Sequence, residues 1–148
     1  MSQTAPSWNV LALASLQAEG LRNGGARRAL IEHLGAQSCC RSAQEIFGGI
    51  REQGGRVGIA SVYRGLDQLV ELNLVQRVDL GDGIARFEAH RAGGEHHHHL
   101  VCDDCGKVQP FSDPALEKAL ERTASRLEVG LDAHEVVLHG NCGDCRAA

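Results

Sequence analysis

The chain has 148 residues, 43% of them hydrophobic and only 3% aromatic, so any core must be built from aliphatic side chains. Its one early apolar run, residues 10–14, is too short to span a membrane and lacks the flanks of a signal peptide, which predicts a cytoplasmic protein with reduced thiols. The formal net charge is -4, but residues 1–78 hold eight arginines against six acidic residues. This asymmetry allows an N-terminal part that approaches phosphates.

Helical spacing of apolar residues predicts four helices in the first half of the chain. The third has the clearest beginning, because Ser42 and Glu45 match a capping box, and two glycines follow its expected end. The predicted helices cover residues 7–19, residues 27–34, residues 42 to about 53, and residues 59–72.

A β-hairpin is predicted directly after these helices. Residues 74–80 alternate between apolar and polar, residues 81–83 form a glycine-rich turn, and residues 84–90 are strand-like. Helices followed by a two-stranded wing are typical of the winged helix-turn-helix. We therefore predict an α+β fold that begins with a winged-helix DNA-binding domain over residues 1–90.

Two glycines predict a hinge at residues 91–95, and residues 96–148 then form a small α/β domain. A domain of this size has a marginal core unless a metal or a partner subunit stabilises it. Its elements are expected as strands at residues 96–102, 107–111 and 134–139, with a helix at residues 114–127.

Two C-x-x-C motifs lie in this second domain, Cys102 with Cys105 and Cys142 with Cys145. Two-residue spacing lets both sulfurs of a motif reach one ion, and four thiolates complete the tetrahedral coordination of structural zinc. A redox pair is the alternative for either motif alone. Two such motifs in one reduced chain favour zinc, and zinc binding would then contribute to folding.

Four consecutive histidines, His96 to His99, precede the first cysteine motif. Alternate side chains of a strand point to opposite faces, so His96 and His98 (the even pair) face one way and His97 and His99 (the odd pair) the other. Each pair can chelate an ion, which predicts two metal sites on opposite faces. The alternative is a solvated polar loop.

Other donors can complete these two sites. For the even pair, the candidates are Glu117 on the predicted helix and His134 at the start of the last strand. For the odd pair, they lie across the hinge, at Glu88 and His90 near the end of the wing and at Cys40 before the third helix. A site with ligands from both domains would fix the angle between them, so an ion could switch DNA binding.

With these residues in view, the sequence resembles the ferric uptake regulator family over nearly its whole length. The matching stretches are residues 58–66, 86–88, 96–107 and 139–145. The resemblance implies a homodimeric repressor with a winged-helix domain and an α/β dimerisation domain. Such a repressor binds palindromic double-stranded operator DNA when loaded with its metal, and it is not an enzyme.

The resemblance also implies a metal for each group of donors. It implies structural zinc on the four cysteines, a second site at His96, His98, Glu117 and His134, and a regulatory site around His97 and His99 with Glu88. His90 stands where several zinc sensors have a cysteine, and Cys40 where iron sensors usually have a histidine. Gln76 replaces an acid that some zinc sensors use.

The resemblance places the DNA contacts on the fourth predicted helix, at Ser61, Tyr63 and Arg64. Tyrosine and arginine suit thymine methyl groups, phosphates and base edges. Tyr63 could instead pack in the core, since its neighbour in the sequence is apolar. Arg22 and Arg27, near the first loop, are expected to contact phosphates.

The sequence leaves two rival functions and two regulatory metals open. A metalloenzyme needs an open coordination position and a positioned base, and the sequence has no G-x-S-x-G, P-loop or H-E-x-x-H motif. A thiol redox sensor could use Cys39 and Cys40, although neighbouring cysteines form a strained disulfide. Zinc prefers the nitrogen and sulfur donors, whereas Glu88 suits iron or manganese equally well. Control of zinc uptake genes is the first interpretation, and control of iron uptake the alternative.

Overall fold

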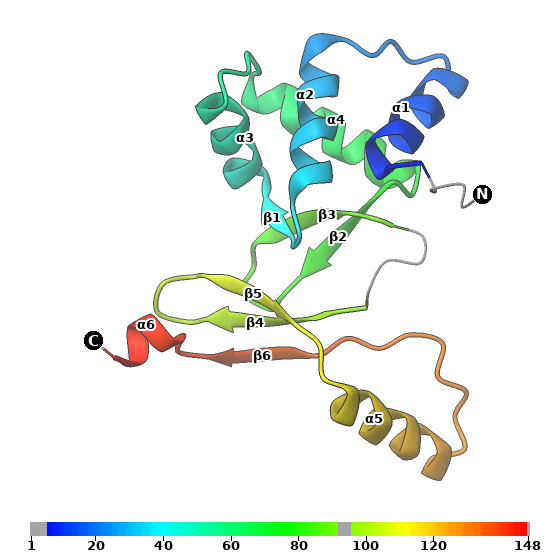
Figure 1. The fold of residues 1–148 in the computed structure, drawn as a ribbon, viewed down its shortest axis with the longest axis vertical. Helices are drawn as coiled ribbons and strands as arrows, with labels where there is room; N and C mark the ends of the chain where they lie inside the picture. Colours follow the sequence, from blue (N-terminus) through cyan, green and yellow to red (C-terminus); the bar gives the residue numbers. More distant parts are fainter. Residues whose placement is uncertain (1–5, 92–95, 148) are drawn as a thin grey trace, which may run out of the picture. The chain divides into compact units, whose positions relative to one another are not determined.

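The computed structural model describes residues 6–91 and 96–147. Contacts divide the chain into two compact units, residues 1–94 and 95–148 (Figure 1). Of the predicted hinge at residues 91–95, only Arg91 lies within the described residues. None of the helices in the described ranges is long and apolar enough to cross a membrane.

The N-terminal unit packs four helices against a small antiparallel sheet whose strands are ordered β1-β3-β2. The last two strands form the predicted hairpin, and a bidentate ion pair from Arg86 to Asp82, at 2.9 and 2.8 Å, closes its turn. This is a winged helix. Its elements are α1 (Trp8–Ala18), α2 (Gly25–Ala36), β1 (Arg41–Ser42), α3 (Ala43–Glu52), α4 (Ile59–Glu71), β2 (Val75–Asp79) and β3 (Ala85–Ala89).

Local sequence explains where the key helices begin and which face they bury. The predicted capping box is confirmed, because Ser42 Oγ accepts the Glu45 N–H at 3.2 Å and the Glu45 carboxylate accepts the Ser42 N–H at 2.8 Å. In α4, Val62, Leu66 and Leu69 recur at helical spacing and are all buried. The opposite face of α4 is thereby left for solvent or a ligand.

The C-terminal unit is a three-stranded sheet, ordered β5-β4-β6, with one long helix and one short helix. Strand β4 pairs antiparallel with β5 and parallel with β6. The elements are β4 (His98–Cys102), β5 (Val108–Phe111), α5 (Pro114–Arg126), β6 (Val137–Gly140) and α6 (Gly143–Arg146).

Some predicted boundaries were wrong. The last strand begins at Val137, so His134 precedes it in a loop and does not open it. His96 and His97 precede β4 instead of lying within it. The sequence did not predict β1 or α6, because elements of two and four residues carry no recognisable period.

Gly49 in α3 faces a buried ring, and its replacement gives a testable prediction. A Cβ at this position would lie 2.3 Å from His33 Cε1 in α2. Glycine to alanine in a helix normally stabilises by up to about 1 kcal/mol, but overpacking costs about 1–3 kcal/mol. We expect Gly49→Ala to lower the free energy of unfolding, measured by urea denaturation.

Gly48, one residue earlier in the same helix, is the matched control. A Cβ there would meet nothing within 4 Å. Gly48→Ala should therefore stabilise the protein by helix propensity alone, or leave it unchanged. Equal effects of the two substitutions would contradict a close approach of His33 to α3.

Candidate metal centres and nucleic-acid interface

The parallel pairing of β4 and β6 brings the two cysteine motifs together. Each motif lies at the carboxyl end of one of these strands, and the register places Cys102 opposite Gly140. The Asp103 N–H donates to the Gly140 carbonyl at 2.8 Å, which aligns the two ends. The first motif turns back through Gly106, whose φ of +73° favours glycine, and its N–H donates to the Cys102 carbonyl at 2.9 Å.

The resulting cluster has the geometry of a tetrahedral sulfur site. The four sulfurs of Cys102, Cys105, Cys142 and Cys145 all lie within 4.8 Å of one another, and none forms a disulfide. In a zinc site with Zn–S distances of about 2.3 Å, the sulfurs are about 3.8 Å apart. The sulfurs of Cys105 and Cys142 are separated by 3.8 Å.

The electrostatics of these four thiols favour the binding of a cation. Hydrogen bonds from the backbone of Cys142, then of Cys105, lower the pKa of Cys102 to about 6. The neighbouring sulfurs, that of Cys142 first, raise the pKa of Cys145 well above its ordinary value. Four thiolates cannot accumulate here without a counter-charge, which a divalent ion supplies. The donor set therefore fits zinc.

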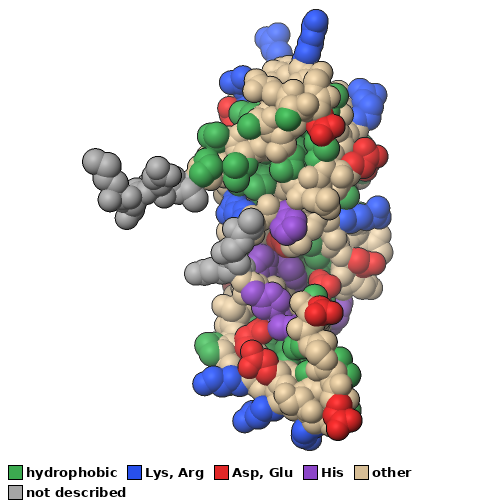
Figure 2. Space-filling view, turned by 90° about the vertical axis from the view of Figure 1, so that its right-hand side faces the viewer, with side chains coloured by type: hydrophobic (Ala, Val, Ile, Leu, Met, Phe, Trp, Pro, Cys, Tyr) green, Lys and Arg blue, Asp and Glu red, His purple; other side chains and the backbone are tan. Residues whose placement is uncertain are grey.

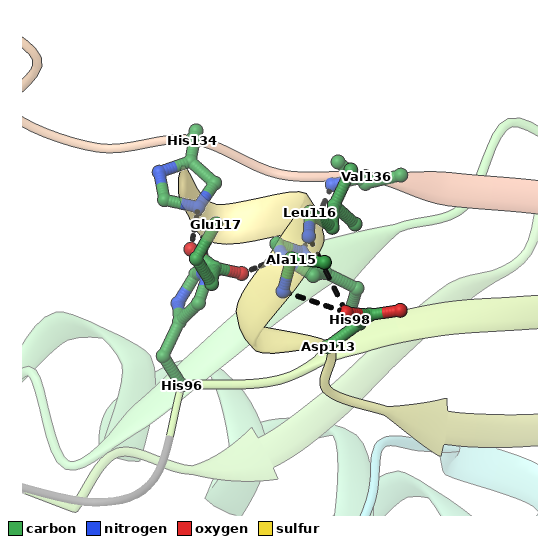
Figure 3. A network of polar contacts seen from close by, with 8 residues as sticks. All are labelled: His96, His98, Asp113, Ala115, Leu116, Glu117, His134 and Val136. Carbon is green, nitrogen blue, oxygen red and sulfur yellow. Dashed lines mark hydrogen bonds and ion pairs between the residues drawn. The ribbon is translucent and has the colours of Figure 1, made fainter. Parts of the chain in front are cut away.

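The even histidine pair joins a second cluster, built around the Glu117 carboxylate of α5 (Figure 3). Its Oε1 lies 2.6 Å from His98 Nε2, and its Oε2 lies 2.6 Å from His134 Nε2. The rings of His96 and His134 approach to 3.1 Å between their Nε2 atoms. Three imidazoles thus converge on one carboxylate.

Backbone contacts orient this cluster. The Val136 N–H donates to His98 Nδ1 at 3.2 Å, which turns Nε2 toward Glu117. Helix α5, which carries Glu117, begins at a cap in which Asp113 accepts the N–H groups of Ala115 and Leu116. Hydrogen bonds from His98, then from His134, lower the pKa of Glu117. Donors of this kind suit zinc and, through the carboxylate, iron(II).

The two histidine pairs divide as strand alternation predicted, although the first two residues precede β4. The ring centroids of His96 and His98 are 4.5 Å apart, and those of His97 and His99 are 4.9 Å apart. Only the even pair belongs to the Glu117 cluster. The odd pair lies outside this cluster.

Of the expected N-terminal donors, Cys40 and Glu88 lie together and His90 does not join them. Donor atoms of Cys39, Cys40 and Glu88 are all within 4.8 Å of one another. The His90 ring is exposed, with Nδ1 3.2 Å from the Asn73 carbonyl. Cys39 was not among the predicted ligands, and its only signal in the sequence is its position next to Cys40.

The residues expected to contact DNA lie in two places. Ser61, Tyr63 and Arg64 are on α4, and Arg22 and Arg27 are just before α2 and in its first turn. Tyr63 is 40% exposed, so it is not a core residue, and the exposed Arg64 donates to Ser61 Oγ at 3.3 Å. Arg22 is exposed, whereas Arg27 donates to the Arg22 carbonyl and, at 2.7 Å, to Gln68 of α4. Basic side chains protrude at the upper end of the N-terminal unit in Figure 2.

A winged helix, followed by a small unit that brings metal-binding side chains together, defines a metal-responsive transcriptional regulator. The profile of the Ferric uptake regulator family matches residues 18–139. This chain belongs to the ferric uptake regulator family. It is accordingly a DNA-binding transcriptional regulator of metal homeostasis and not an enzyme.

Individual relatives agree with the family assignment. The ferric uptake regulation protein of Bacillus subtilis is 34% identical over 105 residues, which cover 70% of each chain. The ferric uptake regulator of Vibrio cholerae has a TM-score of 0.75 at 34% identity, covering 88% of this chain and 98% of its own. That of Helicobacter pylori, described as having three functional metal-binding sites, has a TM-score of 0.81 at 27% identity, covering 97% and 95%.

Proposed function

We propose that this protein is a zinc-responsive repressor that binds a palindromic operator as a metal-loaded homodimer and controls zinc uptake genes. The observation that carries the choice of zinc is the placement of the Cys40 thiol beside Glu88. Thiolate is a soft donor that favours zinc over iron(II) and manganese(II) in a mixed site. The cytoplasmic location expected from the sequence stays a prediction.

Control of iron uptake is the second candidate. It is favoured by the Glu88 carboxylate, a hard donor, and by relatives that are named ferric uptake regulation proteins. Operator affinity measured against buffered zinc, iron(II), manganese and nickel decides between the two. Zinc should give full operator binding at the lowest free concentration of these ions, and a stronger response to iron(II) would favour the alternative.

Each donor group has a proposed role. Cys102, Cys105, Cys142 and Cys145 would hold structural zinc, for which their sulfur spacing is suited. His96, His98, Glu117 and His134 would hold a second ion. The regulatory ion would be bound by His97 and His99 with Glu88 and Cys40, and the contribution of His90 also stays a prediction.

Exposed apolar side chains in the C-terminal unit support the homodimer. Helix α5 is amphipathic, yet none of its residues is buried in the single chain. Leu127, Val129, Leu131 and Leu138 are also exposed. Apolar surface of this extent in a small unit indicates a protein interface, and a second copy of the same chain would cover it symmetrically.

Helix α4 is the proposed reading element, and Arg64 gives its test. An arginine that contacts a base edge contributes about 1–3 kcal/mol. Arg64→Ala should therefore weaken operator binding by about 5- to 150-fold, measured by fluorescence anisotropy, without lowering thermal stability.

Arg64→Lys separates the two kinds of contact that Arg64 could make. A lysine keeps the charge but loses the fork of donors that reads guanine. If Arg64 reads a base, the lysine variant should lose discrimination between operator and random DNA. If it contacts only phosphate, both affinities should change together and the salt dependence should persist. Wild-type affinity in Arg64→Ala would remove this helix from the interface.

A further inference from the structure

Two adjacent cysteines precede β1 in the N-terminal unit, and the roles proposed above use only one of them. Cys39 and Cys40 are both buried, and their sulfurs lie within 4.8 Å of each other and of a Glu88 carboxylate oxygen. Two thiols and a carboxylate this close together form a donor set that can bind a divalent ion.

The local backbone explains why neighbouring residues reach the same carboxylate. Strand β1 pairs antiparallel with β3, and Arg41 lies opposite Phe87, so the preceding Cys40 comes next to Glu88. Side chains of consecutive residues in a strand would point to opposite faces. Here the chain bends at Ser38 and Cys39, before the strand begins, and the bend brings both sulfurs to one side.

The carboxylate is also held in place. Gln76 lies directly opposite Glu88 in the β2–β3 pair, and its side-chain amide donates to Glu88 Oε1. A ligand that is oriented by a second hydrogen bond binds an ion with less loss of side-chain entropy. Gln76 thus orients the Glu88 ligand without binding the ion itself. An acidic residue at this position could have bound the ion directly.

We propose that Cys39 and Cys40 both bind the regulatory ion, so that the N-terminal unit supplies two thiolates and the Glu88 carboxylate. Binding replaces two thiol protons, which pass to solvent, by one divalent cation. Two sulfurs and one oxygen fill three of the four positions of tetrahedral zinc, with S–S separations of about 3.8 Å, so that one of the two odd histidines completes the site. Soft sulfur donors disfavour iron(II) and manganese(II). The inference rests on the proposed metal-responsive function and adds Cys39 as a residue that determines metal specificity.

The test uses cobalt(II) as a spectroscopic probe in the full-length protein, kept reduced and with zinc already in the four-cysteine site. Cobalt–thiolate bonds give a charge-transfer absorption whose intensity rises with the number of sulfurs. Wild type, Cys39→Ser, Cys40→Ser and the matched control Ser38→Ala are titrated with cobalt(II). Zinc and iron(II) affinities are then measured by competition.

We expect each cysteine variant to lose about half of the charge-transfer absorption of the added cobalt, whereas Ser38→Ala keeps it. Zinc affinity should fall at least tenfold in Cys39→Ser, with a smaller change for iron(II), so that the selectivity for zinc declines. A Cys39→Ser spectrum identical to that of wild type, with normal selectivity, would overturn the inference.

Separate control measurements test whether each variant folds and whether the proposed function is correct. Circular dichroism before cobalt addition shows whether each variant is folded, and Cys39→Ala serves if the serine variant is not. Operator binding by the wild type with and without zinc tests the proposed function itself. If wild type responds to zinc while Cys39 proves dispensable in both variants, the inference fails and the proposed function stands. If wild type ignores every metal tested, the proposed function fails first.

Discussion

Replacing Cys102 or Cys145 by serine should release one tightly held zinc per chain and unfold the C-terminal unit. The four sulfurs join the ends of β4 and β6 to the last helix, and the described part of this unit has few buried apolar side chains. Binding energies of structural zinc are about 10–16 kcal/mol, and that energy is available only to the folded form. Losing one ligand removes a large part of it.

Zinc content after desalting and hydrogen exchange of the C-terminal unit measure this effect. Cys40→Ser is the matched control, because it removes a thiol from the N-terminal unit and should keep the tightly held zinc. Chelation of wild-type protein should reproduce the unfolding seen in the Cys102 variant. Full zinc content together with unchanged thermal stability in both variants would show that the four cysteines are not a zinc site.

The double variant His97→Ala with His99→Ala should lose metal-dependent operator binding while it remains a folded dimer with its cysteine zinc. The proposed regulatory ion takes ligands from both units, and it can shift their arrangement only through its different affinity for the DNA-binding and inactive forms. Coupling of this kind is typically about 5- to 150-fold in affinity, and all of it should disappear. By linkage, operator DNA must tighten metal binding in the wild type by the same factor.

The even pair supplies the comparison. His96 and His98 lie around Glu117, and they are not among the proposed ligands of the regulatory ion. The double variant His96→Ala with His98→Ala should therefore weaken mainly the dimer. Operator affinity across a buffered free-metal series is measured for both double variants. Equal losses would mean that the two faces do not divide these roles. A normal metal response in the His97/His99 variant would place the sensor elsewhere.

Local sequence patterns were sufficient to predict most helices and strands and the cluster of four cysteines. The capping box at Ser42 and the apolar spacing of α4 predicted both helices, because these signals act within one or two turns. The two C-x-x-C motifs predicted that the four cysteines lie together, because two such motifs in one chain are the usual ligands of a shared structural zinc ion. Strand alternation likewise separated the two histidine pairs.

By itself, the sequence determined the helices, the wing and the types of donor, because each depends on residues close together in the chain. Only the tertiary structure decided how donors from distant segments meet. The parallel pairing of β4 with β6 brings the cysteine motifs together, and a loop, not a strand, carries His134 to Glu117. The bend before β1 turns Cys39 toward Glu88. Strand pairing and backbone bends arise from long-range contacts, and one residue of shift reverses the face on which a side chain lies.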